Sequence, residues 1–192
     1  MRYLTLFILS ILFITGLLAQ KEAPQSSKLN YFNHTQVSLL IGEESEDQQR
    51  KAMIPSFQTT NGIRIGSHWG IGLGVGVEPY EYVAFPVFMS GYYFLNNKKT
   101  SPYCAFKGGY AFANSHKKIG NYYYNSGYDN KGGLMFNPEI GVRVKVSGFD
   151  LTLSGGYRFQ RLESRVTADG TIYTYTHKVD YKRTSVTLGI IF

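Results

Sequence analysis

Charged residues in this chain stand at alternate positions inside otherwise uncharged segments, a spacing that suits ion pairing on one face. Residues 139–145 read EIGVRVK, so Glu139, Arg143 and Lys145 share one parity and three branched apolar residues share the other. Side chains of one parity point to one face of an extended strand. The spacing therefore predicts a face on which charges pair with one another. Its expected charged members are Arg64, Lys107, Glu139, Arg143, Lys145, Arg158 and Arg183.

One other grouping, Ser164 with His177 and Asp180, has the residue types of a hydrolase. A nucleophile, a base and an acid must lie within hydrogen-bond reach to act together. The hairpin register given below pairs His177 with Leu162 and Ser164 with Tyr175, and we interpret this as placing His177 and Ser164 on opposite faces. We therefore expect no enzyme activity, and a lipid-modifying enzyme is the less favoured alternative.

The sequence offers no recognisable set of metal ligands. The four histidines, His34, His68, His116 and His177, lack the pairwise spacing of a zinc site. Cys104 is the only cysteine, which excludes an intramolecular disulfide and a site built from several cysteines. We predict no metal and no cofactor.

The chain is basic, with a formal net charge of +7. Such a charge favours anionic partners, including lipopolysaccharide and nucleic acid. No zinc-finger, helix-turn-helix or RNA-binding pattern supports a nucleic-acid partner, and we expect none.

The elements that position these residues are strands. The chain contains 21 Gly, 16 Tyr and 13 Phe, whereas a soluble α/β enzyme would carry more Ala, Leu and Glu, and a disordered chain fewer aromatics. After the first segment no convincing helical pattern follows. The composition therefore predicts an all-β domain.

The N-terminal segment predicts export. A basic residue near the start, the apolar run LTLFILSILFITGLL and the small residue Ala19 are typical of a secretory signal peptide cleaved after Ala19. We expect residues 1–19 to be this signal peptide, residues 20–30 a short periplasmic leader, and residues 31–192 one barrel domain.

Period-2 alternation predicts eight strands, joined in turn by short and by longer polar connections. The short ones are 67–69, 96–101 and 147–150, and the longest connection is 114–132. An even number of strands, with short turns at one end and long loops at the other, is typical of a transmembrane β-barrel. The sequence thus predicts an eight-stranded antiparallel up-and-down barrel. Its strands are expected at 34–42, 55–66, 70–78, 83–95, 102–113, 133–146, 151–166 and 172–192.

The apolar parity would face lipid and the charged parity would fill the interior. An eight-stranded barrel is just filled by its side chains, so we expect the charges to form a plug. Gln58, Asn137 and Gln160 share the interior parity, and Glu78 is expected at the outer rim.

Two turns set the predicted register. An Asp-Gly turn at 169–170 would pair Leu153 with Val186 and Leu151 with Leu188, apolar beside apolar. A slip of one residue would place every one of these side chains on the wrong face.

The preceding turn, taken at 148–149, would pair Glu139 with Arg158. We expect this ion pair, flanked by Arg143 and Arg183, to be the centre of the plug. A buried charge needs a partner, and removing one member of such a pair costs roughly 3–5 kcal/mol.

The strand signatures GVRV at 141–144 and GYRF at 156–159, together with the terminal strand TSVTLGIIF, resemble those of the small outer-membrane β-barrel family, the OmpA/OmpX-like barrels. The resemblance covers residues 31–192 and implies an outer-membrane location with both termini in the periplasm. It also implies that the terminal strand is read by the barrel-assembly machinery. We expect the barrel to lack the periplasmic peptidoglycan-binding domain of OmpA proper, so the resemblance does not imply cell-wall anchoring. The implied assembly signal is Val186, Leu188, Ile190 and Phe192.

These observations favour an envelope-structural or surface-interaction role. The expected partners are outer-membrane lipid, lipopolysaccharide and the barrel-assembly machinery. Residues 114–132 and 164–178 would supply any contact with an extracellular ligand, because Tyr-rich, adaptable surfaces are common in recognition. A small gated pore that prefers anions is the alternative, since basic groups outnumber acidic ones on the interior face.

Overall fold

The computed structural model describes most of the predicted domain. The predicted signal peptide (1–19), nearly all of the leader (20–30) and the predicted turn at 169–170 lie outside the described residues. Within the described part, no helix is long and apolar enough to cross a membrane. The described ranges are 29–43, 52–80, 83–114, 116–121, 124–168 and 174–192, with side chains described in them except at 114–130 and 164–177.

The described chain consists of antiparallel strands joined by turns. Each strand is hydrogen-bonded to its neighbours in the order β5-β4-β3-β2-β1-β9-β8-β7-β6. The strands are β1 (Leu29–Gly42), β2 (Met53–Ile65), β3 (Trp69–Pro79), β4 (Val83–Phe94), β5 (Thr100–Asn114), β6 (His116–Asn121), β7 (Tyr124–Val146), β8 (Phe149–Ala168) and β9 (Thr174–Ile191).

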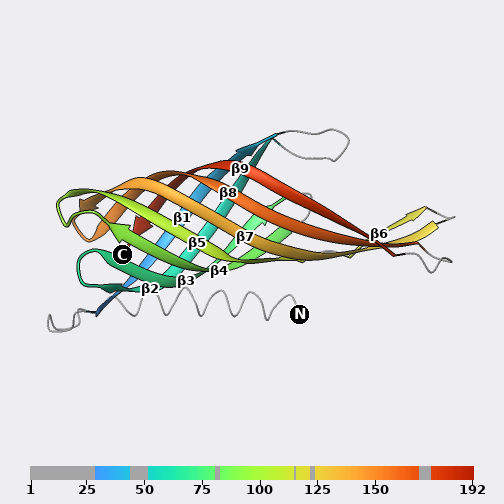
Figure 1. Ribbon diagram of the computed structural model, residues 1–192, viewed down its shortest axis with the longest axis horizontal. Helices are drawn as coiled ribbons and strands as arrows, with labels where there is room; N and C mark the ends of the chain where they lie inside the picture. Colours follow the sequence, from blue (N-terminus) through green and yellow to red (C-terminus); the bar gives the residue numbers. More distant parts are fainter. Residues whose placement is uncertain (1–28, 44–51, 81–82, 115, 122–123, 169–173) are drawn as a thin grey trace.

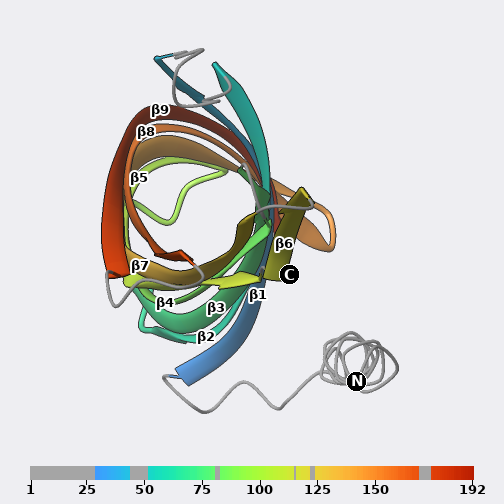
Figure 2. The ribbon, with the colours of Figure 1, turned by 90° about the vertical axis from the view of Figure 1, so that its right-hand side faces the viewer.

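The sheet closes on itself. An additional pairing joins β5 to β7, and β6 pairs with β7 beyond that ring. Eight strands therefore form a closed antiparallel barrel, and β6 lies in an extension at one end (Figure 1). Seen along the barrel, the strands wrap into a ring (Figure 2). The predicted fold class is confirmed.

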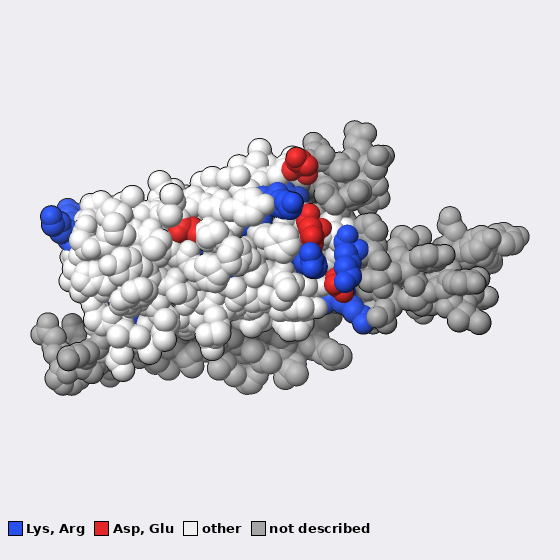
Figure 3. All heavy atoms as spheres, viewed as in Figure 1, with Lys and Arg blue, Asp and Glu red and all other residues white. Residues whose placement is uncertain are grey.

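The outer face of the wall is apolar, as the alternation predicts. Ile140 is 73% exposed and Leu188 is 63% exposed, although both belong to long strands in the middle of the sheet. The side of the barrel in Figure 3 is largely free of charge between a band of mixed charges at one end and a few basic groups at the other. This inverts the arrangement of a soluble barrel and suits a wall surrounded by hydrocarbon.

The register differs from the prediction by two residues in both of the hairpins whose turns were predicted. Val144 pairs with Leu151, and Glu139 pairs with Gly156. The reason is that the turn occupies 147–148, where Gly148 has a φ of 89° that favours glycine. Because a shift by two preserves parity, every residue keeps its predicted face.

The hairpin of β8 and β9 is shifted in the same way. Leu153 pairs with Leu188 and Leu151 with Ile190, so apolar residues still meet apolar residues. The predicted pairing of Leu153 with Val186 is wrong, and Val186 lies opposite Gly155 instead.

The segment 114–132 was expected to be a loop, and this is wrong for most of its length. β6 and the first part of β7 form a paired hairpin there, with His116 opposite Asp129 and Asn121 opposite Tyr124. β7 also stays paired with β8 as far as Ser126 and Ala168. The strands therefore continue as a sheet past the end of the barrel, on the right in Figure 1.

Candidate functional site

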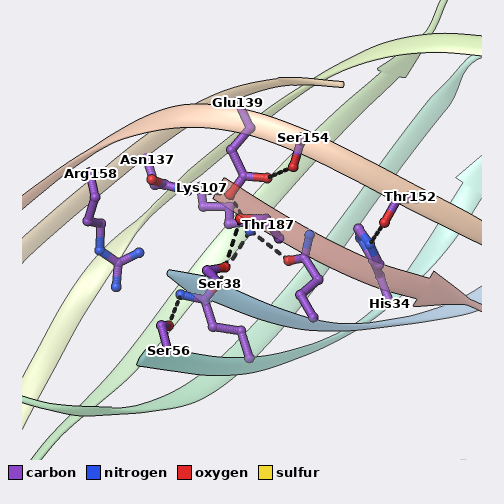
Figure 4. Close-up of polar contacts among 12 residues, drawn as sticks. His34, Ser38, Ser56, Lys107, Asn137, Glu139, Thr152, Ser154, Arg158 and Thr187 are labelled. Carbon is purple, nitrogen blue, oxygen red and sulfur yellow. Dashed lines mark hydrogen bonds and ion pairs between the residues drawn. The ribbon is translucent and has the colours of Figure 1, made fainter. Parts of the chain in front are cut away.

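A buried ion pair lies at the centre of the barrel. Lys107 on β5 and Glu139 on β7 are 0% and 2% exposed, and Lys107 Nζ lies 2.6 Å from Glu139 Oε1. The ammonium group also donates hydrogen bonds to Gln36 Oε1 (2.6 Å) and Gln58 Oε1 (3.2 Å). All three donor positions of the lysine thus have acceptors (Figure 4).

The Glu139 carboxylate is held by two further donors. Asn137 Nδ2 donates to Oε1 and Ser154 Oγ donates to Oε2 at 3.1 Å. With Lys107, these contacts engage both carboxylate oxygens, which is what a buried charge requires.

A second buried pair joins β3 to β8. Arg158 Nη2 contacts Glu78 Oε1 across the interior, and both residues are 0% exposed. Ser56 Oγ donates to the same oxygen at 2.8 Å, and Gln58 Nε2 does so at 3.1 Å. Gln58 touches both ion pairs and so links them into one network.

These contacts correct two predictions. Glu139 pairs with Lys107 and Arg158 with Glu78, so the predicted Glu139–Arg158 pair is wrong because of the two-residue shift in register. Glu78 belongs to the interior instead of the outer rim. The second pair spans the barrel, and such a contact depends on the tilt of the strands as well as on hairpin pairing.

Below this network, toward the short turns, lies a layer of aromatic and basic groups. The guanidinium carbons of Arg143 and Arg64 lie 4.5 Å and 4.8 Å from the ring centroid of Phe94. Asp150 Oδ2 lies 3.6 Å from Arg143 Nη1 and 4.0 Å from Arg64 Nη2. Arg143 thus belongs to this layer and does not flank Glu139.

Asp150 was missed from the sequence because it was assigned to a turn. Asp150 is the second residue of β8 and has the parity of Thr152 and Ser154, which face the interior. If the predicted strand 151–166 were extended by one residue, its alternation would place Asp150 on the interior face, as the acid of this layer.

His34 is part of the same half of the barrel. Its buried ring lies with Nε2 3.0 Å from Thr152 Oγ1 and Nδ1 3.3 Å from Tyr92 Oη. Tyr92 packs edge-on against Phe32, with ring centroids 5.6 Å apart. This end of the interior is therefore closed by aromatic side chains. The buried apolar cluster here is Phe32, Tyr92, Phe94, Tyr103, Ala105 and Ile191.

The opposite end of the network is closed by a second apolar layer. Arg183 lies in it, with its guanidinium carbon 5.4 Å from the ring centroid of Tyr181 and 6.0 Å from that of Tyr80. Its Nη1 donates to the backbone oxygen of Ala52 at 3.2 Å. Arg183 was expected beside Glu139, and the structure places it in this layer instead. The cluster consists of Leu40, Ile54, Tyr80, Ala84, Ala111, Leu162 and Tyr181.

Lys145 was predicted in the interior network, but it lies at the rim with the short turns. Its Nζ donates to Asn97 Oδ1 at 2.6 Å and to the Asn97 backbone oxygen at 3.0 Å. It therefore ties β7 to the β4–β5 turn and takes no part in the central pairs.

The predicted assembly residues form one outward row on β9. Val186, Leu188 and Ile190 are exposed, and Phe192 follows the strand. The backbone N–H of Phe192 donates to Asn33 O at 2.9 Å, and Asn33 N–H donates to Phe192 O at 3.1 Å. The row is thus held at the seam with β1.

A band of outward-facing charges lies on β8 and β9, beyond the apolar part of the wall. Arg161 Nε donates to Asp180 Oδ1 at 2.7 Å and its Nη2 donates to Oδ2 at 2.9 Å. This two-pronged contact lowers the pKa of Asp180 below its usual value. Glu163 and Lys178 form a neighbouring pair at 3.1 Å. The apolar part of the outer wall therefore ends before this band.

The grouping considered for hydrolysis is arranged differently from the prediction. Ser164 and His177 are directly paired in the β8–β9 ladder. Directly opposed residues share one face of a sheet, so the prediction that these two lie on opposite faces is wrong. Asp180 is engaged by Arg161 through both of its oxygens. Among the described residues, no group of three or more His, Cys, Asp or Glu is placed to hold a metal ion.

The closed eight-stranded wall, apolar outside and charged within, defines the architecture of small outer-membrane barrels. Solved structures show the same fold, though at low sequence identity. Neisserial surface protein A matches with a TM-score of 0.58 at 12% identity, over 85% of this chain and 97% of that protein. OprG, an outer membrane protein of Pseudomonas aeruginosa, matches at 0.58 and 9% identity over 84% and 94%.

A third structure, the outer membrane protein AlkL in lipid bilayers, matches with a TM-score of 0.55 at 13% identity, over 90% of this chain and 95% of that protein. No protein-family model and no curated protein matches the chain by sequence. At these identities the structural likeness shows the fold alone.

Proposed function

We propose that this protein is an integral outer-membrane barrel of the OmpA/OmpX-like kind, with both termini in the periplasm and an envelope-structural or surface-interaction role. The observation that carries the proposal is the inverted wall: the largest fully buried side chains include Arg143, Arg158 and Lys107, whereas the exposed face is aliphatic and aromatic. Only a hydrocarbon surrounding makes such an outer face favourable along a whole barrel.

The first experiment tests the barrel in the membrane. The protein should fractionate with outer membranes and show a folded band that shifts on heating in gel electrophoresis. Recovery of the protein in the soluble periplasm, with no heat-modifiable band, would contradict the proposal.

We propose that the interior is a plug. Two ion pairs, Lys107–Glu139 and Glu78–Arg158, share Gln58 and lie between two apolar layers. Planar bilayer recordings of the reconstituted protein should show no regular conductance steps.

A small pore that prefers anions is the second candidate, and an observation favours it. Among the side chains that the structure describes, five interior basic residues accompany three acidic ones. The basic residues are Arg64, Lys107, Arg143, Arg158 and Arg183, and the acidic ones are Glu78, Glu139 and Asp150. Conductance steps that change size in Glu139→Ala would support the pore and overturn the plug.

Surface interaction would use the sheet that extends past the barrel. Backbone pairing along β6, β7, β8 and β9 supports a protruding platform there. Binding of intact cells or lipopolysaccharide to the full barrel should weaken when residues 164–178 are replaced by a short turn, with the heat-modifiable band as the control for folding. Unchanged binding would assign contact to another surface.

Catalysis is not part of the proposed role. Lipid hydrolysis by the reconstituted barrel should equal that of empty vesicles and be unchanged in His177→Ala. Hydrolysis that is lost in His177→Ala and in Ser164→Ala would contradict this.

The terminal row is proposed to act in assembly. Replacing Phe192 by Ala should reduce the amount of folded barrel in the membrane more than it reduces the stability of barrel refolded in detergent. Equal losses in both assays would indicate a purely structural role for this residue.

A further inference from the structure

A groove of ≈ 710 Å³ indents the outer wall where β4, β5, β7 and β8 lie side by side. Its volume falls within the range of about 300–1,000 Å³ that is usual for small-molecule sites. The groove is on the face that the proposed function exposes to lipid, so its natural contents are hydrocarbon. Its outward-facing lining includes Trp69, Gly91, Tyr93, Phe106, Ile140 and Gly155.

Glycines form the floor of this groove. A Cβ added at Gly91 would meet nothing within 4 Å, and one added at Gly155 would meet only Ser185 O at 3.9 Å. Both positions therefore open outward into free space. Cys104 pairs with Tyr93 on one side and with Ile140 on the other, which makes the groove continuous across three strands.

Large side chains stand around the floor. Gly155 pairs with Ile140, and Gly91 pairs with Phe106, so each glycine has a bulky neighbour in the next strand. This alternation produces a concave strip in an otherwise convex wall. A linear, flexible chain fits such a strip, whereas the convex wall of a second barrel does not.

The groove begins at the end of the barrel that carries the short turns. Trp69 opens β3 and pairs with Tyr93, and their ring centroids are 4.6 Å apart. Trp and Tyr prefer the boundary between hydrocarbon and head groups. The mouth of the groove thus lies at the depth of the head groups of the periplasmic leaflet, in the orientation proposed above.

Basic residues stand just beyond this mouth. β4 ends at Phe94, and the turn that follows it contains Lys98 and Lys99, both exposed. Tyr93 is five residues before Lys98, and the strand rises by about 3.3 Å per residue. The Cα atoms of Tyr93 and Lys98 are therefore at most about 17 Å apart, which is less than the thickness of one leaflet, about 20–22 Å.

We propose that the groove binds an acyl chain of an anionic phospholipid from the periplasmic leaflet, whose phosphate is attracted to Lys98 and Lys99. The small floor receives the chain, the aromatic pair marks the head-group boundary, and the lysines select for negative charge. The inference rests on the membrane orientation given under Proposed function.

Native mass spectrometry of the barrel, released from micelles that contain phosphatidylglycerol and phosphatidylcholine, tests the site. We expect one retained phosphatidylglycerol in the wild type. The variants Gly91→Leu and Gly155→Leu fill the groove and should lose this adduct. Gly108→Leu is the matched control, because Gly108 is also outward, with a contact of 3.5 Å to Phe106, but does not line the groove.

Head-group selection is tested separately through Trp69, the only tryptophan of the chain. In vesicles of brominated phosphatidylcholine, unbrominated phosphatidylglycerol should protect Trp69 from quenching more than its mole fraction predicts. Lys98→Gln with Lys99→Gln should reduce this preference by about fivefold for each lysine. The lysines lie in an exposed turn, so this variant tests the inference without altering the wall.

Equal retention of lipid in the groove variants and in the wild type would overturn the inference. So would equal protection by both head groups, or a barrel dimer that disappears in Gly91→Leu. A heat-modifiable band and membrane fractionation in every variant show that the barrel itself is intact. Failure of those two checks in the wild type would instead overturn the proposed function.

Discussion

Glu139 and Ile140 are neighbours in the sequence of β7, yet one is 2% exposed and the other 73%. The difference extends over the whole wall: its inner face buries ion pairs, and its outer face presents aliphatic and aromatic groups. The comparison teaches that stability has a different origin on each face. Inside, it depends on finding a partner for every charge, and outside it depends on containing no charge at all.

The largest effect is expected from breaking an interior pair. Glu139→Leu would leave Lys107 buried without its carboxylate, and removing one member of such a pair costs about 3–5 kcal/mol. Reversible urea unfolding in lipid vesicles, followed by Trp69 fluorescence, measures the loss.

The matched control removes both charges. Glu139→Leu combined with Lys107→Met should recover most of the stability, because well-packed apolar residues often replace a buried pair without loss. If Glu139→Leu alone were as stable as the wild type, the stability of the inner face would not depend on pairing its charges, and the contrast between the two faces would be wrong.

A charge placed on the outer face should have the next largest effect. Leu188 is exposed on β9, and Leu188→Arg should cost about 2–4 kcal/mol if that face lies in the bilayer midplane. Thr100→Arg, at the end of the wall with the short turns, should cost only about 0–1 kcal/mol. Equal and negligible changes in the same unfolding experiment would indicate a face in contact with water.

Glycines on the two faces should differ as well. A Cβ at Gly109, which faces inward, would lie 2.1 Å from Val87 O, whereas one at Gly91 would meet nothing within 4 Å. Gly109→Ala should therefore cost about 1–3 kcal/mol through overpacking, and Gly91→Ala should be neutral. Thermal unfolding of the two variants side by side decides this, and a reversed order would contradict the assigned faces.

The smallest effect is expected at the exposed pair on β8 and β9. Arg161 lowers the pKa of Asp180, so the pair stabilises the fold above the ordinary carboxyl pKa of about 3.9 and ceases to do so as the pH falls through the lowered value. The small difference between wild type and Asp180→Asn should be present at pH 7 and vanish at acidic pH. A difference that grows on acidification would contradict this assignment, and addition of salt should reduce it.

Side-chain parity alone predicted the faces of the wall correctly. Lys107, Glu139 and Arg158 are interior residues, and Val186, Leu188 and Ile190 are exterior ones, as expected from their alternation. Parity survives the two-residue error in register, which is why the fold class could be predicted while the ion pairs could not. The single glycine turn at 147–148 decides which residues face one another along a hairpin.

Contacts across the interior could not be predicted from the pairing of residues within hairpins. Glu78 on β3 meets Arg158 on β8, two strands that share no hydrogen-bonded ladder. Their meeting depends on barrel diameter and strand tilt, which arise only when all eight strands close. The prediction of a loop at 114–132 was wrong for another reason. The segment has the Gly- and Asn-rich composition of a loop, although its described backbone continues as paired strands.

The seam between β1 and β9 has a kinetic consequence. His34 pairs with Ile191 in this ladder, so the seam joins the first strand of the barrel to the last. Each other ladder of the ring joins strands that lie close along the chain, and only β6 stands between β5 and β7. Loop-closure entropy rises with the logarithm of chain separation, and non-local pairing slows folding. The seam should therefore form last, and until it does, both strands present open edges on which an assembly factor, or an aggregating neighbour, can add a strand.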